Sequence, residues 1–536
     1  MNEPTTFKAF DRYADFTDLK ALNEWSLKPL RKSLRVNTLK CSTDELLKWG
    51  KAKNWMLEPV PWCKEAFFID RVDRGEALGK DLLHLLGYFY MQEAASMLPV
   101  TLLDPQPGDR VLDMSAAPGS KTTQIADALA ATQRINKEHL SARAESRGDK
   151  CSYPDGGHGS TPLTMTNQSR GLLIANDVQE KRIWGMLSNL QRCGVVDVIV
   201  TKKVGQWFTG NMTEMFDRVL CDAPCTAQGT VRKDSDALTY CSLDNIGKMA
   251  KLQRELLESA VHACKVGGRI VYSTCTLTPE ENEDVVLSIL NKFGDQLEVV
   301  DPYEARSDKR EATSGFFDQA IQDSHNVQDW LRRENLPLTA YRLPLLRLWP
   351  QTYDTEGFFC AVLQKKAPTR QRKWKDQEIH RWSLVANARM KEAKDRLADW
   401  FGTPFMRDDE VLVESKEQMM IVPQAAIEFR LPVNPYLAGL PFAKLTNHGL
   451  PRLSHEMTTL RGREATKQVI VLSEEEMRQS LKGVNVRFDQ TNVRDGDVLL
   501  AIDSPAFGRP ILFGRGMLKQ GTILNRLPRE VVRMFA

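Results

Sequence analysis

The stretch QPGDRVLDMSAAPGSKTTQIADALA, residues 106–130, decides the fold class. Its first part is a short apolar segment, its middle is a turn of small residues, and its end has the spacing of an amphipathic helix. A strand that leads through a Gly- and Pro-containing turn into a helix is the opening unit of a doubly wound α/β fold. We therefore expect this turn to lie at the carboxyl edge of a parallel sheet, where such folds bind ligands.

Strand-like and helix-like segments continue to alternate after residue 170. The strand-like segments are GLLIAND (171–177), VVDVIVT (195–201), FDRVLCD (216–222) and GGRIVYST (267–274), with helical patterns at 178–194, 246–264 and 279–293. Alternation of this kind predicts a mostly parallel sheet with helices on both faces. A late pair, PLLRLWP (344–350) and GFFCAVLQK (357–365), predicts a closing hairpin. The polar, aperiodic stretch 131–170 interrupts the pattern and is expected to be an insertion loop.

The turn has the composition of a ligand-binding loop. Its small residues allow a ligand to approach the backbone, yet it has neither the Walker A pattern nor GxGxxG, so a pyrophosphate ligand is not expected. Asp177 ends the second strand, where an acid binds ribose hydroxyls. It lies 64 residues after Asp113, and 24 once the 40-residue insertion is set aside, close to the about 20 expected. The alternative is a turn that only packs a helix.

Two cysteines stand at equivalent places, each just past a predicted strand. Cys225 follows Asp222-Ala223-Pro224, and Cys275 follows VYST and precedes a helix start at Pro279. Because their strands are expected to be neighbours, the two thiols should converge beside the ligand cleft. A thiolate is a strong nucleophile for an electron-poor carbon. The competing interpretations are buried hydrophobes, which we expect for Cys193, Cys241, Cys264 and Cys360, and a weakly supported zinc pair of Cys221 with Cys225.

Length and composition exclude several other classes. A chain of 536 residues is too long for one core, and 42% hydrophobic with 27% charged residues is typical of globular proteins. The apolar runs are too short to span a membrane, and the acidic N-terminal residues do not resemble a signal peptide, so a cytoplasmic location is expected. Ten scattered cysteines form no disulfide framework. A net charge of +3 does not by itself indicate a nucleic-acid partner.

Several motifs together resemble one known family. They are AAPGSKT (116–122), DAPC (222–225), YSTCTLTPEENE (272–283) and EGFF (356–359). This set is similar to the NOL1/NOP2/Sun family of RNA cytosine-C5 methyltransferases. Further segments resemble its bacterial RsmF subfamily, which modifies 16S rRNA: PLRKSLRVNTLK (29–40), PVPWCKEAFFID (59–70), YMQEAASMLP (90–99), VRKDSDAL (231–238) and LPREVV (527–532).

The resemblance implies a fold and four domains. It implies a Rossmann-like S-adenosylmethionine-dependent methyltransferase core over 91–366, after a small α+β, ferredoxin- or RRM-like RNA-binding domain over 1–90. A basic linker and a further domain are expected over 367–465, and a PUA-like β-barrel over 466–536. The last of these also fits short β-like runs separated by Gly and Pro.

The resemblance also assigns roles to individual residues. Cys275 falls on the nucleophile, Cys225 on the residue that resolves the covalent adduct, and Asp222 and Asp177 on strand-end acids, Asp177 being the ribose acid. The cofactor S-adenosyl-L-methionine would lie on Ser115, Ala116, Ala117, Pro118, Gly119, Ser120 and Lys121, with Asp222 beside it. One position departs from the family pattern: TKKVGQWF (201–208) has Val204 where the family has an acid near the adenine.

The expected partner is 16S rRNA of the small ribosomal subunit, bound by a monomer. RNA enzymes of this kind hold folded RNA through shape and phosphates, and we expect contacts from Arg31, Lys32, Arg35, the basic segment 365–382 and the terminal domain. Solvated charge is the alternative for each of these segments. Two other functions remain open: the same chemistry on tRNA or 23S rRNA, and an RNA-binding assembly factor with weak or lost methylation.

Overall fold

A computed structural model of the chain describes residues 7–71, 77–130, 170–307, 314–333, 342–371, 379–415, 418–444, 451–488 and 493–535. The predicted insertion at 131–170 therefore lies outside the described residues, except for its last residue. Arg170 belongs to the packed structure, because its guanidinium lies 2.6 Å from Asp197 and 2.8 Å from Glu410. In the part of the chain that is described, no helix has the length and hydropathy needed to cross a membrane.

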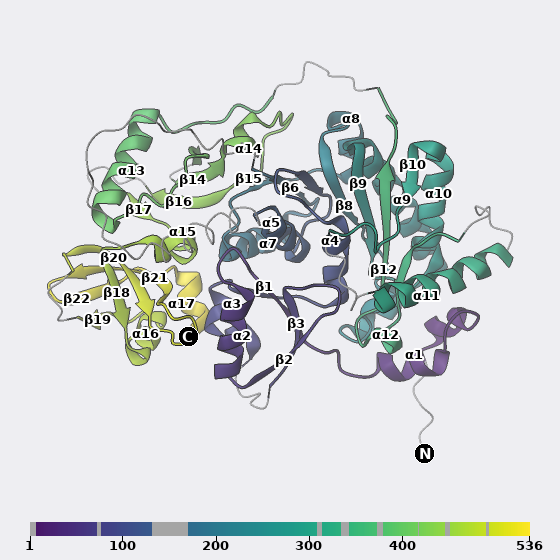
Figure 1. Ribbon diagram of the computed structural model, residues 1–536, viewed down its shortest axis with the longest axis horizontal. Helices are drawn as coiled ribbons and strands as arrows, with labels where there is room; N and C mark the ends of the chain where they lie inside the picture. The colour runs from purple at the N-terminus through teal and green to yellow at the C-terminus, as the bar shows by residue number, and fades with distance from the viewer. Residues whose placement is uncertain are drawn as a thin grey trace, which may run out of the picture.

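A nine-stranded sheet forms the centre of the molecule (Figure 1). Its main path runs β10-β12-β9-β8-β5-β6-β7-β15, with β11 paired to β12. The parallel strands are β5 (Arg110–Asp113), β6 (Leu172–Asn176), β7 (Val198–Thr201), β8 (Phe216–Asp222) and β9 (Cys264–Thr274). Three strands extend the sheet in antiparallel fashion beyond β9: β10 (Leu297–Val299), β11 (Leu346–Leu348) and β12 (Phe358–Lys365). The Rossmann-like core and its closing hairpin, predicted from sequence, are confirmed.

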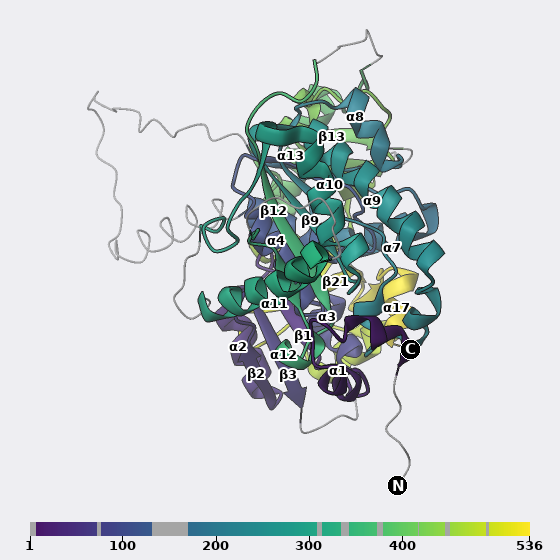
Figure 2. The same ribbon diagram turned by 90° about the vertical axis from the view of Figure 1, so that its right-hand side faces the viewer.

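Helices cover both faces of this sheet and build two apolar cores (Figure 1, Figure 2). One face packs against α4 (Leu98–Leu103), α5 (Ser120–Leu129) and α7 (Glu180–Cys193). The other packs against α8 (Phe208–Asn211), α9 (Leu243–Ala263) and α10 (Glu283–Phe293). Because both faces are covered, the central strands have apolar middles, as β6 illustrates with five consecutive buried residues of which the first four are apolar.

An antiparallel sheet of four strands precedes the core. Its order is β2-β3-β1-β4, from β1 (Ser33–Val36), β2 (Trp55–Pro59), β3 (Ala66–Arg71) and β4 (Phe89–Met91). With α2 (Thr43–Ala52) and α3 (Leu82–Leu85) between them, the element order is βαββαβ, that of a ferredoxin-like fold.

The first residues of the chain lie apart from this sheet. Helix α1 (Leu19–Ser26) packs beside α12 (Pro350–Tyr353) of the central core, as both views show (Figure 1, Figure 2). Phe10, Tyr13 and Leu22 share a buried cluster with Trp349 and Leu277 of that core. Residues 10–22 therefore pack with the core rather than with the sheet that follows them.

A third sheet follows the core, and one short strand from the same part of the chain joins the central sheet. Its order is β13-β14-β16-β17: β13 (Glu410–Ser415), β14 (Gln418–Pro423), β16 (Leu440–Lys444) and β17 (Arg452–Leu453). Helices α13 (Asn387–Phe401), α14 (Gln424–Glu428) and α15 (His455–Arg461) accompany it. The two-residue strand β15 (Leu437–Ala438) leaves this part of the chain and pairs with β7 of the central sheet. The sequence pattern contains no sign of this pairing.

The C-terminal domain is built on a five-stranded sheet of order β18-β20-β21-β22-β19. Its strands are β18 (Val469–Leu472), β19 (Val486–Arg487), β20 (Gly496–Ile502), β21 (Ile511–Lys519) and β22 (Thr522–Asn525), with helices α16 (Glu474–Leu481) and α17 (Arg529–Phe535). No pairing joins β18 to β19 among the described strands. The predicted closed PUA-like barrel is therefore not confirmed.

Candidate active site

The turn after β5 lies at the carboxyl edge of the central sheet, at the point where the strand order reverses. Strand β5 pairs with β6 on one side and with β8 on the other. The turn is tied to both neighbours: the Met114 N–H donates to Leu220 O at 3.0 Å and the Ala116 N–H donates to Asn176 O at 2.8 Å. Gly119 has φ +104°, which permits the entry into α5, and a Cβ at this position would lie 3.3 Å from Met186 Cγ. The turn therefore lies at the edge of the sheet where the sequence predicts it, and its role as the cofactor loop stays a prediction.

The predicted ribose acid closes one side of this loop. Asp177 follows β6, is only 2% exposed, and accepts hydrogen bonds from the N–H groups of Ala117 at 3.3 Å and Gln179 at 2.9 Å. Arg182 of α7, which the sequence analysis did not select, lies 3.5 Å from the same carboxylate. The loop of small residues and the strand-end carboxylate fit a nucleoside such as that of S-adenosylmethionine.

Val204 stands where the family pattern has an acid, and its surroundings show the effect of this replacement. It follows β7 at the same edge, and its side chain is 55% exposed. The neighbouring backbone is held by Asn176, whose amide binds both the N–H and the carbonyl of Lys203, at 3.0 and 2.9 Å. The segment is thus fixed without an acid, and position 204 offers apolar contact instead of a hydrogen bond.

The thiols of Cys225 and Cys275 lie in contact, as the sequence predicts. Cys225 follows β8, Cys275 follows β9, and their Sγ atoms lie 3.2 Å apart. The hydrogen bond between the two thiols, together with burial, raises the pKa of Cys225 well above its usual range. The surroundings of Cys225 therefore favour its protonated form. By contrast, Cys193, Cys264 and Cys360 are fully buried and Cys241 is half-buried.

A lysine from the loop joins the cofactor side to the thiol side. The Nζ of Lys121 lies 2.8 Å from Asp222, which also accepts from the Ser273 hydroxyl at 2.7 Å. Burial alone would lower the pKa of Lys121, but Asp222 raises it above its usual value. A charged lysine and a carboxylate at the mouth of the thiol site provide a donor and an acceptor for the polar edge of a base.

A second carboxyl pair near this lysine was missed by the sequence analysis. Glu93 accepts from the N–H groups of Ser96 at 3.0 Å and Glu356 at 3.2 Å. Burial and the neighbouring Glu93 raise the pKa of Glu356 to about 7, against the opposing charges of Lys233 and Lys121. Both acids lie in segments with family motifs, YMQEAASMLP and EGFF, but nothing in either segment alone indicates that they meet.

Two of the expected RNA contacts are wrong. Arg35 is 2% exposed and pairs with Asp127 and Gln92, because β1 is an inner strand covered on both faces. Lys365 is buried at the end of β12, where it binds Glu214 at 3.1 Å. Arg31 is partly exposed beside Glu58, and Lys32 is exposed. Residues 372–378 of the predicted basic segment lie outside the described residues.

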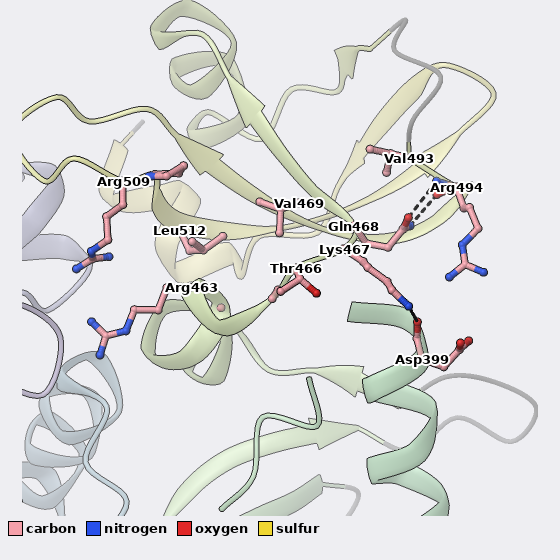
Figure 3. Close-up of a pocket in the computed structure, with 13 residues that line it drawn as sticks. Asp399, Arg463, Thr466, Lys467, Gln468, Val469, Val493, Arg494, Arg509 and Leu512 are labelled. Carbon is pink, nitrogen blue, oxygen red and sulfur yellow. Dashed lines mark hydrogen bonds between the residues drawn. The ribbon is translucent and has the colours of Figure 1, made fainter. Parts of the chain in front are cut away.

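An open pocket of about 710 Å³ lies where the third and C-terminal sheets meet (Figure 3). We call it the basic pocket; its charged lining residues are Arg463, Lys467, Arg494, Arg509 and Asp399. In Figure 3, Arg463 and Arg509 point to one side and Arg494 and Lys467 lie at the other, with Val469 and Leu512 between them. The four cations thus line an elongated surface rather than one point.

Comparison with known proteins agrees with this arrangement. A family model described as "16S rRNA methyltransferase RsmB/F" matches residues 100–148 and 140–364, and one described as "N-terminal domain of 16S rRNA methyltransferase RsmF" matches 8–94. The chain is 32% identical to "Ribosomal RNA small subunit methyltransferase F" of Aeromonas salmonicida over 514 residues, which are 94% of this chain and 92% of that one.

The chain belongs to the RsmB/F family.

A second RsmB/F relative of the same printed name, from Vibrio campbellii, is 33% identical over 513 residues, with 94% and 92% of the two chains covered. Among solved structures, a methyltransferase homologue from Pyrococcus horikoshii is 29% identical, with a TM-score of 0.47, covering 66% of this chain and 93% of its own. NSun6 from the same organism, solved with SFG, is 20% identical with a TM-score of 0.48, covering 68% and 99%. The RsmB/F match spans the loop, both thiols and Glu356.

Proposed function

We propose that this protein transfers a methyl group from S-adenosylmethionine to C5 of a cytosine in 16S rRNA, in the cytoplasm. Membership of the RsmB/F family supports the substrate class, and the printed names of the relatives are those of small-subunit rRNA methyltransferases. The observation that carries the mechanism is the 3.2 Å contact between Cys225 and Cys275, beside a loop suited to a nucleoside.

The chemistry follows from the unequal thiols. Cytosine C5 is a poor nucleophile, and attack of the Cys275 thiolate on C6 converts the ring to an enamine that reacts at C5. Lys121 and Asp222 are placed to hydrogen-bond the N3 and amino edge of the base and favour its electron-poor form. S-adenosylmethionine supplies the methyl group from its sulfonium when bound on residues 115–121 and Asp177.

Release of the product reverses the attack. The C5 proton leaves to a base in the cleft, the C6–S bond breaks, and Cys275 departs as a thiolate. The S–H of Cys225, 3.2 Å away, is placed to hydrogen-bond the departing sulfur and so assist this step. Each thiol thus serves one half of the reaction.

The test of the nucleophile is Cys275→Ala. We expect methyl transfer to be abolished while the Kd for S-adenosylmethionine changes less than about twofold, because the thiol contacts the base and not the sulfonium. Single-turnover transfer to 16S rRNA and calorimetric titration of the cofactor measure the two quantities. Substantial residual transfer would refute the role of Cys275, and absence of cofactor binding by the unaltered protein would favour an RNA-binding assembly factor.

We also propose that the basic pocket and the exposed Lys32 contact the phosphate backbone of the RNA. The support is the exposure of Lys32 and the four cations that line the pocket against one acid, with Arg509 paired to Glu45 beyond the lining. Lys467→Ala should weaken rRNA binding and reduce the slope of log K against log salt by about 0.9. Filter binding at several salt concentrations measures this. An unchanged slope would show that Lys467 only faces solvent, and Lys391→Ala on the exposed face of α13 is the matched control.

A further inference from the structure

A fully buried carboxylate lies directly behind the two thiols. Glu281, six residues after Cys275, has 0% exposure. One of its oxygens accepts from the hydroxyls of Thr226, Thr278 (2.9 Å) and Thr276 (3.3 Å), and the other accepts from the Thr226 N–H at 3.0 Å and the Gln253 amide at 2.8 Å. All of these donors are neutral. The carboxylate is held by hydrogen bonds and not by an ion pair among the described residues.

These donors come from the two segments that carry the thiols. Thr226 directly follows Cys225, and Thr276 directly follows Cys275. Their hydroxyls also contact each other at 3.0 Å. Glu281 therefore bridges the segments that follow β8 and β9, one residue beyond each sulfur-bearing cysteine.

The charge of Glu281 also acts on the thiols. It is one of the causes that raise the pKa of Cys225, after the hydrogen bond shared with Cys275, burial and the charge of Cys275. A buried charge without a cation is costly, and an amide would satisfy fewer of these donors. A carboxylate at this place disfavours a second negative charge on the nearer sulfur.

We propose that Glu281 is the positioning residue of the two-thiol centre: its carboxylate ties the segment of Cys225 to that of Cys275, fixes the spacing of the two sulfur atoms and places a negative charge behind Cys225. This inference rests on the proposed function. It assigns the division of labour between the thiols to a residue that touches neither substrate nor cofactor. In the attack step Cys275 carries the negative charge and Cys225 the proton, and in the release step the same hydrogen bond receives the departing thiolate.

The experiment compares Glu281→Gln with Glu280→Gln. The neighbouring Glu280 is the matched control, because it pairs with Arg12 at the surface and binds neither thiol segment. We expect Glu281→Gln to lower kcat for rRNA methylation about ten- to a hundredfold, since small misplacement of a reacting group has effects of this size. KM and the Kd for S-adenosylmethionine should change less than about twofold, and Glu280→Gln should leave kcat unchanged.

A second measurement separates the effect of the Glu281 charge from the effect of its packing. In the Cys275→Ala background, alkylation of Cys225 by iodoacetamide is followed against pH. Glu281→Gln should shift this profile to lower pH, because it removes a negative charge that disfavours the thiolate. A purely structural role for Glu281 does not predict such a shift.

The outcomes separate the two proposals. Normal kcat in Glu281→Gln, or an unshifted alkylation profile, overturns the inference, while Cys275→Ala that still methylates overturns the proposed function beneath it. If Glu281→Gln does not fold, as judged by its Tm and cofactor binding, Thr226→Val provides the same test. It removes the hydroxyl bonds to Glu281 and Thr276 while keeping side-chain volume, and a kcat within twofold of the unaltered protein would equally refute the positioning role.

Discussion

Cys225 and Cys275 have the same side chain, and only their surroundings distinguish them. Cys225 has its pKa raised by the neighbouring sulfur, by burial and by Glu281. Cys275 stands at the start of a segment that leads into α10, with Lys121 and Asp222 at the mouth of the site. In the proposed mechanism, the raised pKa of Cys225 suits the thiol that assists release, and Cys275 is the thiol that attacks.

At this scale, Cys225→Ala should trap the reaction half-way. Cys275 can still attack C6 and C5 can accept the methyl group, but the departing thiolate loses its hydrogen-bond donor. We expect a protein–RNA adduct that survives denaturing gels, requires S-adenosylmethionine, and is absent from the Cys225→Ala/Cys275→Ala double variant. Cys193→Ala, a buried cysteine away from the site, is the control and should cost only about 1 kcal/mol of stability. An adduct trapped by Cys275→Ala instead would mean that the roles are reversed.

At the scale of elements, the site depends on how closely three backbone segments approach one another. The Gly229 N–H donates to Cys275 O at 2.9 Å, and the Gly357 N–H donates to Gly229 O at 2.9 Å. A Cβ on Gly229 would lie 2.1 Å from Gly357 O and 2.7 Å from Cys275 O. The loop after β8, the loop after β9 and the start of β12 thus form one backbone layer beneath the thiols.

Gly229→Ala should consequently damage catalysis through the backbone. The added methyl group must push the Cys275 segment away, and we expect at least a tenfold loss of single-turnover rate. Its control is Gly247→Ala in α9, where a Cβ meets nothing within 4 Å and alanine favours the helix, so activity should be kept and stability slightly increased. Equal rates for the two variants would show that this layer tolerates displacement.

The same scale shows how far the sequence could predict the structure. The strands β5 to β9, buried on both faces, have long apolar runs, and their ends carry Asp177, Asp222 and both cysteines, so the core of the site was predictable. Arg35 was not, because a basic residue in a basic run indicates a surface unless the partner Asp127, 92 residues away, is known. Glu93 and Glu356, 263 positions apart, meet only in the fold. Strand β15 has two residues and hence no periodicity to detect.

At the scale of the whole molecule, buried polar groups join the domains. Lys40 donates to Leu86 O, to Arg192 O at the end of α7 and to Thr459 of α15, at 2.7, 2.8 and 3.0 Å. Glu410 of β13 lies between Arg461 of α15 and Arg170 at the start of β6. Such joints give the domains one fixed arrangement, which an enzyme requires if it must hold a folded RNA and a single extruded base together.

The ion pairs of Glu410 with Arg461 and Arg170 predict how the stability of the protein changes at acidic pH. The hydrogen bonds and charges of Arg461, with that of Arg170, outweigh burial and lower the pKa of Glu410 to about 2. Its stabilisation is therefore complete above the ordinary pKa near 4.5 and disappears as the pH falls toward 2. Glu410→Gln should reduce the free energy of unfolding at pH 7 by about 3–5 kcal/mol, with a smaller difference at pH 3. Urea denaturation at both pH values measures these free energies. Glu414→Gln is the control: its pair with Arg389 is exposed, so the free energy of unfolding should hardly change.

The position of β15 in the sequence has a consequence for the folding of the newly synthesised chain. Leu437 pairs with Val200, 237 positions earlier in the chain, and until it arrives β7 is an open edge of the central sheet. At a synthesis rate of about 5–20 residues per second, β7 remains without its partner β15 for roughly 12 to 50 s during synthesis on the ribosome. An uncovered apolar edge strand invites pairing with other chains. The nascent enzyme is thus most exposed to aggregation in the interval between completing its catalytic domain and completing the domain that follows.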